Sequence, residues 1–145
     1  MNKSKGFTII ELLVVVAIIA VLTGIVLVNV TSYINKGKDA AIQGNLSSLT
    51  TNAAAFYDSS TNGFTGFCAG TTAVNPIAAA KLAFANPVQD TADCFETAVA
   101  PAIAWAACSQ LKVTDSYFCT DSTGAKKIIV GRASCVAAWN LDVCP

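Results

Sequence analysis

The sequence predicts an α+β fold, in which a long N-terminal α-helix is followed by a small antiparallel β-sheet. An uncharged apolar run at residues 12–35, an apolar stripe with helical spacing after it, and short strand-like segments in the second half support this class. The 145 residues leave room for about one domain. The apolar fraction of 54% and the mean hydropathy of +0.56 exceed what the core of such a domain needs. Some apolar surface must therefore serve another purpose.

The apolar run has the length of a membrane-spanning helix. It contains no charged side chain over 24 residues, and a helix of that length spans about 36 Å, enough for a hydrocarbon layer of about 30 Å. Lys3 and Lys5 precede the run, so the positive-inside rule keeps them cytoplasmic and places the chain after about Asn35 outside. No good small-x-small cleavage site follows the run, so we expect the helix to be retained.

Glu11 is a lone carboxylate near the start of this segment. An acidic side chain deep in a bilayer costs about 2.5–3.5 kcal/mol and usually has a functional partner. Alternatively, Glu11 lies at headgroup level near the helix N-terminus, where it complements the helix dipole by about 0.3–1 kcal/mol. The residues alone leave both interpretations open.

After a charged cluster at residues 36–39, the pattern becomes amphipathic. Apolar residues recur at intervals of three and four, which is one stripe of a helix: Ile42, Leu46, Leu49, Ala53 and Phe56. We expect one continuous helix over residues 7–58, roughly 78 Å long if straight. Its second half should pack this stripe against the sheet.

The remaining residues predict a short helix and three strands. Pro76 favours the start of a helix over residues 77–85. The expected strands cover residues 102–111, 117–121 and 126–131, with a turn at 121–124 that ends in Gly124. We expect these strands to form an antiparallel meander that lies on the helix. Four residues are expected to pack in its core: Trp105, Leu111, Phe118 and Ile129.

The six cysteines predict three disulfides. All lie in the second half of the chain, on the exported side of the apolar helix: Cys68, Cys94, Cys108, Cys119, Cys135 and Cys144. We expect no metal site, because the chain has no His and its two closest Cys are nine residues apart. Spacing leaves about 15 connectivities open.

The first helix carries a recognisable motif. Residues 5–22, KGFTIIELLVVVAIIAVL, resemble the class III signal of type IV prepilins and of the pseudopilins of type II secretion. The resemblance implies a pilin fold. It implies that prepilin peptidase cleaves the chain after Gly6 and methylates the new N-terminal residue, Phe7. It also implies that Glu11 neutralises the Phe7 ammonium of a neighbouring subunit in the filament, since burying either charge alone is far costlier. Residues 8–10 also match, and we assign them to helix packing.

The same resemblance bears on the disulfides. A pilin's disulfide-closed C-terminal region implies the pair Cys135–Cys144. For the other four cysteines we expect Cys94–Cys119 and Cys68–Cys108.

Charge and motif content argue against two classes of function. Nine Lys plus Arg balance nine Asp plus Glu and the pI is about 6.1, so no field attracts a nucleic acid. Lys126, Lys127 and Arg132 form a small patch, which we interpret as a solvated strand face. The sequence has no GxSxG, Gly-rich phosphate loop or acidic pair in a known catalytic motif. We therefore expect neither an enzyme nor a cofactor.

The leading hypothesis is a structural subunit of a type IV pilus-like filament for adhesion, motility or DNA uptake. Its partners would be other copies of the chain, prepilin peptidase, the inner-membrane assembly machinery and the membrane before assembly, and its final place would be extracellular. The alternatives are a pseudopilin in a periplasmic pseudopilus of type II secretion and an unpolymerised membrane-anchored binding module. Four segments are expected: a leader at 1–6, a filament-core helix at 7–35, an amphipathic helix at 36–58 and a disulfide-stapled globular head at 59–145.

Overall fold

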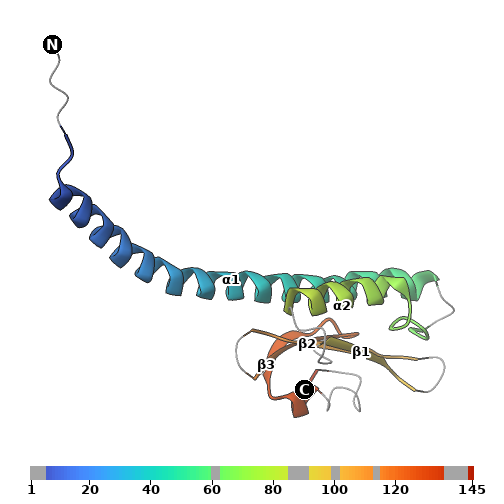
Figure 1. Ribbon diagram of the computed structural model, residues 1–145. Helices are drawn as coiled ribbons and strands as arrows, with labels where there is room; N and C mark the ends of the chain where they lie inside the picture. Colours follow the sequence, from blue (N-terminus) through green and yellow to red (C-terminus); the bar gives the residue numbers. More distant parts are fainter. Residues whose placement is uncertain (1–5, 60–62, 85–91, 99–101, 113–114, 136–143) are drawn as a thin grey trace. The chain divides into compact units, whose positions relative to one another are not determined.

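The computed structural model describes residues 6–59, 63–84, 92–98, 102–112, 115–135 and 144–145, so most of the expected leader lies outside the described residues. The elements follow in the order α1 (Ile9–Ser59), α2 (Thr71–Phe84), β1 (Ala92–Glu96), β2 (Trp105–Gln110), β3 (Ser116–Asp121) and β4 (Lys126–Val130) (Figure 1). The long helix and the antiparallel sheet confirm the predicted α+β class. The chain divides into a first unit, Met1–Ile34, and a second unit, Asn35–Pro145, and we describe each by itself.

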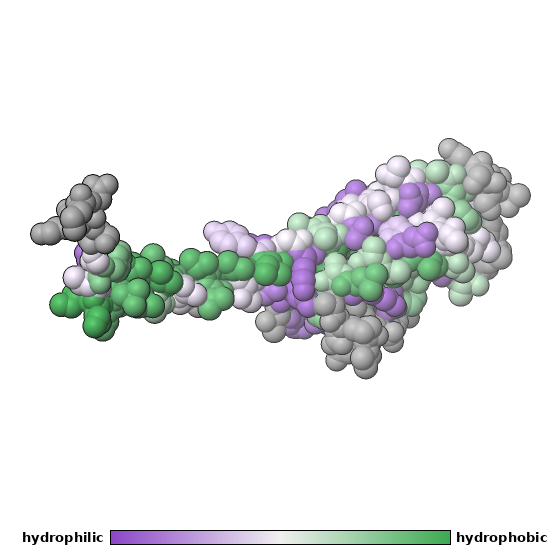
Figure 2. Space-filling model, turned by 45° about the horizontal axis from the view of Figure 1, so that its top comes forward, coloured by the Kyte–Doolittle hydropathy of each residue, from purple (hydrophilic) through white to green (hydrophobic). Residues whose placement is uncertain are grey.

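The first unit exposes its apolar side chains. Every side chain described between Ile9 and Ile34 is exposed, and Figure 2 shows this segment as a nearly continuous hydrophobic surface. Judged by length and composition, α1 is long and apolar enough to cross a membrane. Such a surface is stable only when lipid or protein covers it.

Three polar side chains within this apolar segment donate hydrogen bonds to the backbone of the helix itself. Thr23 Oγ1 donates to the Ile19 carbonyl at 2.7 Å, and Thr31 Oγ1 donates to the Leu27 carbonyl at 3.2 Å. Asn29 Nδ2 donates to a carbonyl one turn earlier in the same way, at 3.2 Å. An unsatisfied donor in hydrocarbon costs several kcal/mol, so these bonds make the segment compatible with an apolar surrounding.

In the second unit, the predicted apolar stripe of α1 forms part of a core. Ile42, Leu46, Leu49 and Ala53 are buried, and Phe56 packs against them. Their partners come from α2, from the 63–70 segment and from the sheet. The stripe is therefore a core face, as its spacing predicted.

Helix α2 begins earlier than predicted. The expected start was residue 77, directly after Pro76, but α2 starts at Thr71 and contains Pro76. The first turn forms because Ala73 and Val74 donate backbone hydrogen bonds to the Gly70 carbonyl. Buried Ala73, Ile77 and Ala80 then hold the helix against the core.

The sheet has four antiparallel strands in the order β1-β2-β3-β4. The three predicted strands correspond to β2, β3 and β4, and the predicted turn is present, with Gly124 at φ 85° donating to the Asp121 carbonyl at 3.0 Å. Strand β1 was not predicted. Its residues include no Val, Ile or Thr, and Phe95 is its only residue of a type enriched in strands.

Each face of the sheet packs on a different layer. Trp105, Leu111 and Phe118 belong to the core that includes α1 and α2. Ile129 is also buried, but it packs on the other face with Tyr117 and with cysteines of the C-terminal region. The four predicted packing residues are thus buried in two separate clusters, because successive residues of a strand point to opposite faces.

Candidate processing and assembly site

The N-terminal site begins at Gly6 and Phe7, directly before α1. The Phe7 side chain is 77% exposed. A Cβ added at Gly6 would meet no atom within 4 Å. Among the residues that the structure describes, no contact therefore requires a glycine at position 6.

Thr8 and Glu11 form a reciprocal pair at the start of α1. The Thr8 backbone N–H and Oγ1 both donate to Glu11 Oε2, at 2.9 and 2.8 Å. In return, the Glu11 backbone N–H donates to Thr8 Oγ1 at 3.3 Å. This is a capping box, in which a threonine N-cap and a glutamate three residues later satisfy two backbone donors that the helix leaves free.

The structure gives Thr8 a hydrogen-bonding role that its assignment to helix packing did not include. Its side chain is exposed and holds the Glu11 carboxylate. The spacing Thr-x-x-Glu before an apolar run was the available signal. Both bonds that Glu11 accepts within the described part of the chain end on Oε2, which leaves Oε1 available to a further donor.

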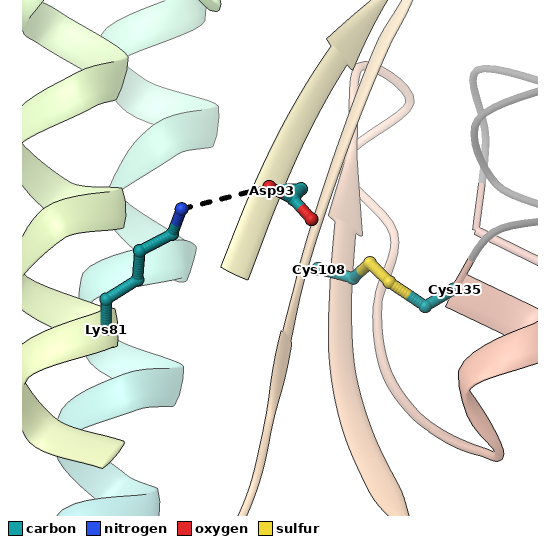
Figure 3. Close-up of polar contacts among 4 residues, drawn as sticks. All are labelled: Lys81, Asp93, Cys108 and Cys135. Atoms are coloured by element: carbon teal, nitrogen blue, oxygen red, sulfur yellow. Dashed lines mark ion pairs between the residues drawn. A yellow bond between two sulfur atoms is a disulfide. The ribbon is translucent and has the colours of Figure 1, made fainter. Parts of the chain in front are cut away.

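All six cysteines form disulfides, as predicted, but the three expected pairings are wrong. The bonds are Cys68–Cys94, Cys108–Cys135 and Cys119–Cys144. Figure 3 shows Cys108–Cys135 joining β2 to the segment after β4. Each bond closes a loop of 25 to 27 residues, which stabilises the fold by about 3–4 kcal/mol in the chain-entropy account.

Strand register explains why two of the three expected pairs do not form. Cys108 lies directly opposite Cys119, so these two share one face of the sheet. Cys94 lies opposite Ala107 and therefore points to the other face, where it packs on the helix-side core with Cys68. Cys94–Cys119 and Cys68–Cys108 would each have to pass through the sheet.

The buried Asp121 of β3 accepts hydrogen bonds from the β3–β4 turn and from Cys144. It is 1% exposed, and its Oδ2 accepts the Cys144 backbone N–H at 2.8 Å. Its Oδ1 accepts the Thr123 N–H and hydroxyl and the Ala125 N–H. Desolvation raises the pKa of Asp121, but the hydrogen bonds from Thr123, Cys144 and Ala125 together outweigh it, and the pKa is lowered from its usual value.

The comparison with known families identifies the N-terminal feature. Residues 1–27 match the prokaryotic N-terminal methylation motif, which is the class III signal peptide of type IV pilins. No curated protein and no solved structure matches the chain.

The motif and the apolar helix together fit a type IV pilin-like or pseudopilin protein, and the motif suggests a structural subunit. The motif implies processing by prepilin peptidase and assembly into a filament. The apolar helix that follows fits anchoring in a membrane before assembly. Gly6, Phe7 and Glu11 thus lie together at one helix start, within the matched residues.

Proposed function

We propose that the protein is a structural subunit of an extracellular type IV pilus-like filament. It is made as a membrane-anchored precursor, cleaved between Gly6 and Phe7 and methylated at Phe7. One observation supports this proposal most directly. The matched motif includes the start of a helix whose described apolar side chains, from Ile9 to Ile34, are all exposed. Lipid covers this surface in the precursor, and the helices of other copies cover it in the filament.

Glu11 is the proposed assembly residue. Cleavage before Phe7 creates an ammonium group near the start of α1, and the apolar surroundings of a helix bundle disfavour any unpaired charge. Glu11 Oε1 of one copy accepts the Phe7 ammonium of a neighbour while Oε2 stays bonded to Thr8. This arrangement supports the pairing because the capping bonds hold the carboxylate at the helix start.

The second unit is the proposed surface of the filament. Three disulfides tie its sheet to the 63–70 segment and to the C-terminal region. Disulfides of this kind persist in oxidising compartments outside the cytoplasm. Adhesion, motility or DNA uptake is the function we assign to such a surface.

The first test is intact-mass and N-terminal analysis of protein sheared from the cell surface, with and without reductant. We expect a chain that begins at methylated Phe7 and gains about six mass units when three disulfides are reduced. A chain that retains Met1 and occurs only in membranes would contradict the proposal and favour the unpolymerised anchor. Processed protein that stays in the periplasm would favour a secretion pseudopilus.

A Glu11→Gln variant separates processing from assembly. It keeps an oxygen that can accept the Thr8 bonds but removes the negative charge. We expect normal cleavage after Gly6 together with loss of sheared filaments. Normal filament yield in this variant would show that the carboxylate charge is not needed for assembly.

A further inference from the structure

Four of the six cysteines lie together on one face of the sheet. Figure 3 shows the Cys108–Cys135 bond on the side of the sheet away from the helices. Cys119 and Cys144 belong to the same buried cluster. Because four clustered cysteines allow more than one pairing, their location on this face does not by itself determine which bonds form.

The sheet permits a competing bond between Cys108 and Cys119, which are direct neighbours across β2 and β3. The Leu111 N–H donates to the Ser116 carbonyl in the same ladder, so these two residues are a hydrogen-bonded pair. Such pairs alternate with non-hydrogen-bonded ones, and Cys108–Cys119, three positions further along, is of the second kind. The Cα atoms of such a pair are about 4.5 Å apart, within the range of about 4.4–6.8 Å at which disulfides form.

Chain length favours the same competing isomer. Cys108 and Cys119 are 11 residues apart, and Cys135 and Cys144 are nine apart. The bonds in the structure span 27 and 25 residues. Closing a shorter loop costs less entropy, so loop length alone favours the competing isomer roughly 20-fold in an unfolded chain. Contacts of the folded chain must therefore favour the observed pairs.

Asp121 provides a contact of this kind, because it holds the Cys144 backbone beside β3. Its Oδ2 accepts the Cys144 N–H at 2.8 Å. Asp121 follows Cys119 by two positions on β3, so both side chains point to the same face. The N–H groups of Thr123 and Ala125 donate to its Oδ1 and fix the carboxylate in place. Cys144 is thus held next to Cys119 by a hydrogen bond to a charged group, which is stronger than a neutral one.

We propose that Asp121 selects the Cys119–Cys144 disulfide over a Cys108–Cys119 disulfide while the cysteines exchange partners. In the competing reaction, the Cys108 thiolate attacks the Cys119 sulfur, a Cys108–Cys119 bond forms, and Cys144 leaves as a thiolate. This exchange keeps the number of disulfides constant, so it needs no oxidant. The hydrogen bond to Asp121 opposes it by keeping Cys144 in place. The inference concerns the second unit alone and does not depend on the proposed filament.

A chain with three cysteines in the cluster tests this choice. Cys135→Ser leaves Cys108 as a free thiol next to the Cys119–Cys144 bond, so the two possible bonds of Cys119 can interconvert. The full-length variant is equilibrated in detergent under nitrogen at a mildly alkaline pH, where thiolates form. Free thiols are then trapped with N-ethylmaleimide, and tryptic peptides are analysed by mass spectrometry without reductant.

The peptide masses show which bond forms. Trypsin separates the three cysteines into three peptides: 113–126 with Cys119, 82–112 with Cys108 and 133–145 with Cys144. We expect 113–126 to be joined to 133–145 in most of the protein. If 113–126 is mainly joined to 82–112, Cys119 prefers its neighbour in the sheet even when Asp121 is present, and the inference is wrong.

Asp121→Ala in the same background removes the contact that holds Cys144. The ratio of the Cys119–Cys144 bond to the Cys108–Cys119 bond should fall about tenfold, because a hydrogen bond to a charged group is lost. An unchanged ratio would overturn the inference.

Glu96→Ala is the matched control. Glu96 also accepts two backbone N–H groups, from Gly66 and Cys68, but it does so beside the Cys68–Cys94 bond. It should leave the ratio unchanged, and an equal fall in both variants would show general destabilisation and overturn the inference. Loss of Cys68–Cys94 in Asp121→Ala, seen by fragmenting the linked peptides, would overturn it too, because the substitution would then disrupt the whole unit. These outcomes leave the filament proposal unaffected, since none of them measures assembly.

Discussion

Asn52 of α1 hydrogen-bonds the backbone of α2 at the carbonyl group of Thr72: its Nδ2 donates to Thr72 O at 2.7 Å. In a regular helix this carbonyl accepts the N–H of the residue four positions later. That residue is Pro76, which has no N–H. Asn52 therefore replaces the donor that Pro76 removes, and this explains in part how α2 continues through a proline.

The bond predicts an energetic coupling between Asn52 and Pro76. Asn52→Ala should lower the free energy of unfolding by about 1 kcal/mol, because the Thr72 carbonyl loses its donor. In a Pro76→Ala background the backbone N–H returns, so the same substitution should cost clearly less, with a coupling of about 0.5–1 kcal/mol. Urea unfolding of the four full-length variants in detergent, followed by tryptophan fluorescence, measures the cycle. Equal costs in both backgrounds would show that the bond is not linked to the proline.

Asp121 predicts a pH dependence of stability. Its pKa is lowered in the folded state, so its contribution is fully present above the unfolded value of 3.8 and is lost as pH falls from there through the folded pKa. Asp121→Asn should lower the free energy of unfolding by about 1.5–3 kcal/mol at pH 7, since hydrogen bonds to a charged group are lost. The difference from the parent should shrink below about pH 4.

Unfolding curves recorded between pH 2 and pH 7 test this prediction. Asp115→Asn is the matched control, because Asp115 is exposed and its φ of 57° suits asparagine as well as aspartate. It should change stability at pH 7 by less than about 0.5 kcal/mol. A difference between Asp121→Asn and the parent that stays constant down to pH 2 would argue against a lowered pKa.

Asp39 links α1 to the end of β2, and its removal should destabilise the second unit. It is 7% exposed, and its Oδ1 accepts the Lys112 backbone N–H at 2.6 Å. The Lys112 ammonium in turn donates to the Phe84 carbonyl at the end of α2 and lies 4.0 Å from the Phe84 ring centroid. Asp39→Ala should lower the free energy of unfolding by about 1–3 kcal/mol, because it leaves the partly buried Lys112 N–H unpaired.

The comparison variant for this prediction is Asp39→Asn. It keeps an acceptor oxygen at the same position, so it should cost less than Asp39→Ala in the same urea titration. If the two variants lose equal stability, the charge and not the hydrogen bond carries the effect.

The sequence was sufficient where local periodicity determines the structure. Intervals of three and four from Ile42 to Phe56 predicted the buried face of α1, and that face is the core. The turn ending at Gly124 joins β3 to β4 as predicted. At the N-terminus the motif placed Gly6, Phe7 and Glu11 together at a helix start, and they lie there.

Sequence reasoning failed where the structure depends on distant residues. Residues 92–96 contain only one residue of a type enriched in strands, Phe95, but β1 pairs along β2 and carries Cys94 to the helix side. Without that register, nothing in the spacing shows that Cys94 and Cys119 face opposite ways. The early start of α2 also depends on a distant residue, since Asn52 is 20 positions away from Thr72.

The disulfide connectivity predicts a distinctive product of non-reducing digestion. Trypsin cuts the denatured chain into four cysteine-containing peptides, residues 39–81, 82–112, 113–126 and 133–145. The bonds in the structure join all four covalently. A Cys135–Cys144 bond would instead release 133–145 as a separate peptide. Mass spectrometry at acidic pH, where thiolates are scarce and exchange is slow, therefore decides between the two connectivities.

The Thr8–Glu11 pair predicts that Thr8 acts on assembly through Glu11. Thr8→Val keeps the shape of the side chain but removes the hydroxyl that bonds Glu11 Oε2, so it should weaken the start of α1 by about 1 kcal/mol and free the carboxylate to move. We expect cleavage after Gly6 to continue, with fewer filaments recovered by shearing. Thr8→Ser retains the hydroxyl and should assemble like the parent. If Thr8→Val blocks cleavage while Thr8→Ser does not, the hydroxyl serves the peptidase, and the positioning role assigned to Thr8 is wrong.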